Sequence, residues 1–93
     1  MVVGVCTWQL SLPGVHSLKE KRTVIRSLKD RIRNKHNASV AETDHRDVWQ
    51  RAEISVAIVG TDTAFVDSVL AKIDRMVEGE TRAVIIGTSR DLW

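Results

Sequence analysis

The stretch SLKEKRTVIRSLKDRIRNKH, which spans Ser17 to His36, decides the fold because its apolar and basic residues recur at helical spacing. Wound at about 100° per residue, it places apolar side chains on one face and basic side chains on a neighbouring stripe. Ser17 and Glu20 have the spacing of a capping box, which predicts the helix start, and Asn37 is expected to end the helix. We therefore expect an amphipathic helix whose apolar face docks on a sheet. The apolar face contains Leu18, Val24, Ile25, Leu28 and Ile32, and the basic stripe contains Lys19, Arg22, Arg26, Lys29 and Arg33.

Four segments around this helix are predicted to be strands. Residues 2–12 alternate with period two, and their even-numbered face is the heavier one, so it should pack on helices. Residues 38–43, 49–59 and 82–89 are the second, third and fourth strands. The last residues, Leu92-Trp93, receive no assignment.

A second helix is predicted between the third and fourth strands. Thr61-Asp62-Thr63 offers N-cap side chains, and Gly79 is placed to end the helix in the left-handed conformation. The order strand, helix, strand, strand, helix, strand predicts an α+β fold, a ferredoxin-like βαββαβ sandwich. Its four-stranded antiparallel sheet should carry both helices on one face, with the first and third strands in the centre. The second helix has the apolar stripe Val66, Val69, Leu70, Ile73 and Val77.

The composition is that of one small domain. The 93 residues are expected to form a single domain, residues 1–93, with a modest core. No apolar run approaches the roughly 20 residues of a membrane span, and the N-terminal stretch alternates like a strand rather than resembling a signal peptide. Cys6 is the only cysteine, which excludes an intramolecular disulfide and a thiolate metal cluster. We expect a cytoplasmic protein.

The net charge of +2 hides an asymmetry along the chain. Residues 1–36 hold eight Lys/Arg and two acids, whereas residues 37–93 hold six Lys/Arg and ten acids. From Arg22 to Arg33 the stripe runs about 16 Å along the predicted helix, with like charges four residues apart. Such a line of cations suits a sugar–phosphate backbone. The alternatives are a solvated helix face, whose side chains snorkel over the core, and an acidic protein partner.

Two motifs resemble the YlxP-like family of small bacterial proteins. They are SLKEKR, residues 17–22, and VAETDHRDVWQRA, residues 40–52, and the likeness covers essentially the whole domain. The resemblance implies a ferredoxin-like fold and a gene setting beside translation-initiation and ribosome-maturation factors. No catalytic residues are established for the family, so the resemblance assigns none here.

The basic stripe and the resemblance together predict a non-enzymatic protein that binds structured RNA or a ribosomal particle. Lys19, Arg22, Arg26, Lys29 and Arg33 are the predicted phosphate contacts. Capture of single-stranded bases on the sheet is not expected, because an RRM stacks bases on central-strand aromatics and the free face here offers only Trp49. The alternative is an interaction module, in which a homodimer or another protein covers the apolar patch of Val3, Val5 and Ala57.

The segment 42–51 is the second candidate surface, with Glu42, Asp44, His45, Asp47, Trp49 and Arg51 as predicted partner contacts. Its carboxylates and imidazole have the chemistry to hold a divalent cation, but no metal-ligand spacing is matched. The simpler interpretation of these residues is a hairpin loop in which an aspartate side chain caps the turn. We predict no metal and no cofactor. The sequence also lacks a Gly-rich phosphate loop and a nucleophile elbow, and Cys6 is expected in the core.

Overall fold

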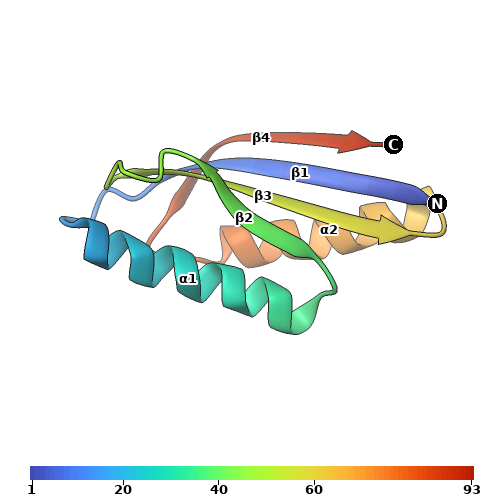
Figure 1. The fold of residues 1–93 in the computed structure, drawn as a ribbon, viewed down its shortest axis with the longest axis horizontal. Helices are drawn as coiled ribbons and strands as arrows, with labels where there is room; N and C mark the ends of the chain where they lie inside the picture. The colour runs from blue at the N-terminus through green and yellow to red at the C-terminus, as the bar shows by residue number, and fades with distance from the viewer.

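The strands and helices follow one another in the predicted order. The computed structural model describes residues 1–93 and has β1 (Val2–Ser11), α1 (Leu18–Lys35), β2 (Ser39–Asp44), β3 (Arg51–Gly60), α2 (Thr63–Glu78) and β4 (Val84–Leu92). The strands form one antiparallel sheet in the order β2-β3-β1-β4, and both helices cover the same face of it (Figure 1). The predicted ferredoxin-like sandwich is therefore confirmed, with β1 and β3 at its centre. Neither helix is long and apolar enough to cross a membrane.

The core lies between the sheet and the two helices. The even-numbered side chains of β1 and β3 point into it, as their alternation predicts, and the indole of Trp8 is fully buried. Its Nε1–H donates to Asp74 Oδ1 on α2 at 2.7 Å, so the one polar group of this side chain is satisfied. The largest fully buried apolar side chains of the two helices are Leu28, Ile32, Leu70, Ile73, Val66 and Val77.

Gly4 is required where α2 crosses β1. A Cβ atom there would collide with Val66 Cγ1 and would lie 3.0 Å from Leu70 Cδ1. The missing side chain therefore lets α2 pack directly on the central strand.

The helix ends differ in detail from the prediction. Ser17 Oγ accepts from the backbone N–H of Glu20 at 3.1 Å, as a capping box requires, but the Glu20 carboxylate accepts from His16 N–H at 3.0 Å. Gly79 ends α2 with φ −73°, so the predicted left-handed conformation is wrong. The chain instead stays right-handed, and the N–H of Glu80 donates to Val77 O at 3.1 Å, which turns the Glu80 side chain inward.

All four strands also differ from their predicted bounds by one to three residues, and two of these differences concern a tryptophan. Trp49 was predicted to begin the third strand, but it lies in the loop before β3 and is 50% exposed. Pairing stops there because β1 ends at Ser11, and Pro13 beyond it has no N–H to offer a neighbour. At the other end, β4 continues to Leu92 and Trp93 exchanges two backbone hydrogen bonds with Val3, at 2.7 and 2.8 Å.

Candidate nucleic-acid interface

The middle of the basic stripe faces solvent without intramolecular partners. Arg22 and Arg26 are exposed and Lys29 is half-buried, and none of the three forms an ion pair. Lys19 is exposed in the first turn and is likewise unpaired. Because α1 is regular from Leu18 to Lys35, Arg22, Arg26 and Lys29 lie along one line of about 10 Å.

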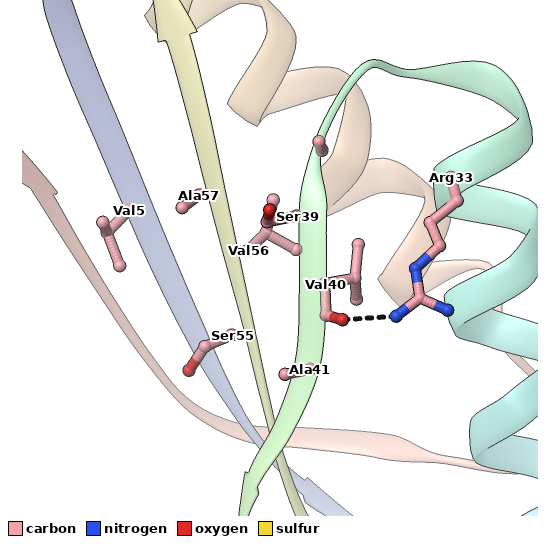
Figure 2. A pocket seen from close by; sticks show the side chains of 9 residues that line it. Val5, Arg33, Ser39, Val40, Ala41, Ser55, Val56 and Ala57 are labelled. Carbon is pink, nitrogen blue, oxygen red and sulfur yellow. Dashed lines mark hydrogen bonds between the residues drawn. The ribbon is translucent and has the colours of Figure 1, made fainter.

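Arg33, the last member of the predicted stripe, is engaged within the molecule. Its Nη2 donates to the carbonyl of Val40 at 2.6 Å, and its Nη1 lies 3.9 Å from Asp30 Oδ1. Figure 2 shows the guanidinium reaching from α1 to β2. β2 is an edge strand, so one of its outward carbonyls needs a donor that the sheet does not supply. Arg33 supplies it, and this side chain protects the sheet edge.

Lys21 has the opposite environment from its neighbour Arg22. Its side chain is 1% exposed, and its Nζ lies 2.8 Å from Glu42 Oε2 on β2. The same ammonium donates to the backbone carbonyls of His45 and Arg46, the latter at 3.4 Å. Lys21 belongs neither to the predicted apolar face nor to the predicted basic stripe. The one feature of the sequence that indicates burial of Lys21 is its position on the helix, beside the apolar residues Val24, Ile25 and Leu28.

The loop between β2 and β3 is therefore tied to α1. His45 sits in the left-handed region with φ 61°, and its N–H donates to Asp44 Oδ1 at 2.8 Å, so Asp44 caps this turn as predicted. Glu42 is used by Lys21. The structure brings no three potential metal ligands together here. Trp49 is exposed in the loop, while Arg51 lies on the open face of the sheet, so the six predicted partner residues do not form one surface.

A groove lies between α1 and this loop. It has a volume of about 460 Å³ and is lined on the α1 side by the free cations of the stripe. Arg46, from the loop, contributes a further cation, which is not among the predicted phosphate contacts. The five cations and two carboxylates of the lining give it a net charge of +3. Its lining residues are Lys21, Arg22, Ile25, Arg26, Lys29, Glu42, Arg46 and Asp47.

Arg31, on another side of α1, is neutralised by an acid. Its Nη2 lies 3.0 Å from Glu80 Oε2, and Arg82 contacts the same carboxylate, which is 5% exposed. Hydrogen bonds from Arg82 and then Arg31 hold the pKa of Glu80 below its usual value. Arg31 is thus part of a structural link between α1 and the segment leading to β4.

Two other titratable groups with shifted pKa values, His36 and Cys6, add nothing to the basic surface. Partial burial and the charges of Lys72 and Lys35 lower the pKa of His36, which favours the neutral imidazole. Burial raises the pKa of the Cys6 thiol, which is fully inside the core as predicted.

The open face of the sheet is polar in its middle. Ser55 Oγ lies 2.9 Å from Thr7 Oγ1 and 2.8 Å from Thr43 Oγ1, while Glu53 accepts from Gln9 at 2.7 Å and from Thr43 at 2.6 Å. These bonds link the side chains across β1, β3 and β2 and leave Gln9 Oε1 as the one buried oxygen of the network without a partner.

One end of that face is apolar. Val59 is 62% exposed and Trp93 is 69% exposed, and the backbone bonds of Trp93 place it beside Val3. Nearby, small side chains of β2 and β3, among them Ala41 and Ala57, leave a hollow of about 500 Å³ (Figure 2). The predicted patch of Val3, Val5 and Ala57 thus extends to Trp93, which had no assignment from sequence.

Comparison with known proteins shows the family. A family described as "Protein of unknown function (DUF503)" matches residues 3–90. The chain belongs to this family. The "Uncharacterized protein YlxP" of Bacillus subtilis (strain 168), to which it is similar, is 32% identical over 83 residues, covering 85% of this chain and 90% of that protein. The resemblance to the YlxP-like family is therefore confirmed.

Solved structures similar to this DUF503 chain show its fold alone. "De novo designed protein Foldit4" has a TM-score of 0.59 at 12% identity, covering 100% of this chain and 97% of that one. The "De novo designed protein LFR1 1 with ferredoxin fold" has a TM-score of 0.58 at 17% identity, covering 99% and 84%. Both likenesses agree with the βαββαβ order of the structure.

Proposed function

We propose that this DUF503 protein is a non-enzymatic binding protein for structured RNA, free or within a ribosomal particle, and that α1 contacts the phosphate backbone. One contrast within α1 carries the proposal. Lys21, Arg31 and Arg33 are all held by acids or carbonyls of the same molecule, whereas Arg22, Arg26 and Lys29 are not. The fold compensates the cations that it needs and leaves an uncompensated row facing water.

Physical chemistry favours a polyanion as the partner of this row. Like charges four residues apart destabilise a helix slightly, so an unpaired row has a small intrinsic cost. Contact with phosphates removes this repulsion and releases condensed counterions, which makes binding favourable and dependent on salt. The open sheet face has no row of aromatics for unstacked bases, so recognition of backbone shape fits better than base capture.

The test is RNA binding as a function of salt. Fluorescence anisotropy with a labelled RNA hairpin should give a line of log affinity against log salt. The variant Arg22→Ala/Arg26→Ala/Lys29→Ala should reduce the magnitude of its slope by about 2 to 3, since each lost phosphate contact removes about 0.7–0.9.

A control variant separates local contact from total charge. Arg51→Ala/Lys72→Ala/Arg75→Ala removes the same number of positive charges from exposed, unpaired positions outside the stripe. Its slope should stay near that of the wild type. Equal losses in the two variants would show that net charge, and not the row on α1, governs binding.

The second candidate function is a protein-interaction module, and the exposed Trp93 beside Val3 and Val59 favours it. A homodimer or a protein partner would cover this apolar end of the sheet, with the hairpin at 42–51 as a further contact. Sedimentation equilibrium discriminates the two: a stable dimer that Trp93→Ser dissociates, together with no RNA affinity, supports this candidate instead.

A further inference from the structure

The groove beside α1 has a second wall that comes from a distant part of the chain. Arg46 lies between β2 and β3, 11 residues beyond the end of α1, yet it lines the same groove as Arg22, Arg26 and Lys29. Arg46 is exposed and forms no ion pair. The groove therefore has cations on two sides, whereas a helix face alone offers them on one.

Lys21 fixes the distance between the two walls. Its buried ammonium donates to the carbonyls of His45 and Arg46, so the backbone that carries the Arg46 side chain is bound directly to α1. The left-handed conformation of His45 turns the chain at this point. A loop held in this way presents its cation at little entropic cost on binding.

The carboxylates of the groove do not cancel its charge. Glu42 lies 2.8 Å from Lys21, so the two compensate each other beneath the surface. Asp47 is the one other acid, and it faces four remaining cations. Three arginines among these cations suit a phosphate, because a guanidinium can donate two parallel hydrogen bonds to phosphate oxygens.

We propose that this groove is a phosphate-binding site in which Arg46 joins Arg22, Arg26 and Lys29, and for which Lys21 is a positioning residue. The inference rests on the proposed function for the source of the phosphate, which is the backbone of a structured RNA. A free phosphate has the same chemistry, and the experiment distinguishes the two sources.

The first arm of the experiment measures the RNA hairpin against Arg46→Ala. This variant should weaken binding by about three- to tenfold and reduce the magnitude of the salt slope by about 1. Arg75→Ala is the matched control, since it removes an exposed arginine of α2 that forms no ion pair and does not line the groove. Its affinity should stay within about twofold of the wild type.

The second arm tests the positioning role of Lys21. The double variant Lys21→Met/Glu42→Gln removes the ammonium and its counter-charge together, so that no buried charge is left unpaired. It should weaken RNA binding as much as Arg46→Ala does, and adding Arg46→Ala to it should cost nothing more. Such non-additivity is expected only if Lys21 acts through Arg46. Circular dichroism confirms that each variant is folded.

The third arm uses inorganic phosphate alone, followed by NMR of the arginine side-chain Nε–H groups. Phosphate should shift the signals of Arg22, Arg26 and Arg46, and Arg46→Ala should abolish the other two shifts. If RNA does not bind and phosphate does, the site is correct and the proposed function is wrong. If RNA binding depends on α1 while Arg46→Ala behaves like Arg75→Ala, the site is wrong and the proposed function stands. Binding of neither probe overturns both.

Discussion

Replacement of Lys21 by methionine should destabilise the fold more than any other single loss of charge on α1. The variant leaves the Glu42 carboxylate, 13% exposed, without its counter-ion, and it leaves the carbonyls of His45 and Arg46 without a donor. Removing one partner of a buried ion pair costs about 3–5 kcal/mol. Methionine keeps most of the buried methylene packing, so we expect a loss of about 3 kcal/mol from the free energy of unfolding.

Urea unfolding followed by far-UV circular dichroism measures this loss. With a slope of about 1–1.5 kcal/mol/M for a domain of this size, the midpoint should fall by about 2–3 M. The free energy of unfolding of a small domain is about 5–15 kcal/mol. The variant should therefore still fold in buffer unless the stability of the wild type lies at the low end of this range. Lys19→Met is the control, because Lys19 is exposed on the same helix, and its effect should stay within about 0.5 kcal/mol.

A double-mutant cycle on Lys21 and Glu42 separates the energy of the ion pair from that of side-chain packing. Glu42→Gln in the Lys21→Met background removes the uncompensated carboxylate, so this double variant should regain about 2 kcal/mol of the loss. The reasoning fails if Lys21→Met costs less than about 1 kcal/mol, or if Glu42→Gln makes that variant still less stable. Either result would mean that the ammonium is hydrated and that the loop does not depend on it.

Two further predictions concern stability away from the groove. Arg82 and Arg31 hold the pKa of Glu80 below its usual 4.5, so the unfolded chain binds this proton more readily than the native state does. This stabilisation is present above about pH 5 and is lost as the pH falls through the lowered pKa. Glu80→Gln should therefore lower the unfolding free energy by about 1–3 kcal/mol at neutral pH and flatten its acid limb in urea titrations at several pH values; an unchanged acid limb contradicts the assignment. Gly4→Ala should cost about 1–3 kcal/mol through collision with α2, whereas Gly14→Ala, with open space around its Cβ, should be neutral or stabilising by up to about 1 kcal/mol. Thermal melts of the two variants check this, and equal melting temperatures would show that α2 moves away freely.

The fold could be predicted because every element carries a one-sided pattern. The alternation of β1 and the apolar stripes of α1 and α2 each specify which face is buried, and the element order then leaves few ways to join them. The pattern fails where burial is weak. β4 is an edge strand with mostly exposed side chains, so apolar and polar residues do not alternate at its end. The strand conformation of these last residues comes from pairing with β1.

The candidate site was predictable only in part, for a different physical reason. Helical spacing correctly places Arg22, Arg26 and Lys29 on one line, because that depends on local geometry alone. Whether a cation on that helix is free depends on acceptors elsewhere: Arg33 meets a carbonyl of the β2 edge, and Arg31 meets Glu80. No local pattern contains those partners.

Lys21 and Arg22 show what separates a structural cation from a binding cation. They are adjacent in the chain and carry the same charge, but one step of 100° turns Lys21 towards the β2–β3 loop and Arg22 towards water. The buried charge needs acceptors in fixed positions, and the loop that supplies them is thereby fixed too. A rigid loop then holds Arg46 opposite the free side chains of α1. The structural cation thus creates the second wall of the groove, and we expect variation at Lys21 to change RNA binding through Arg46, although its own charge never reaches the ligand.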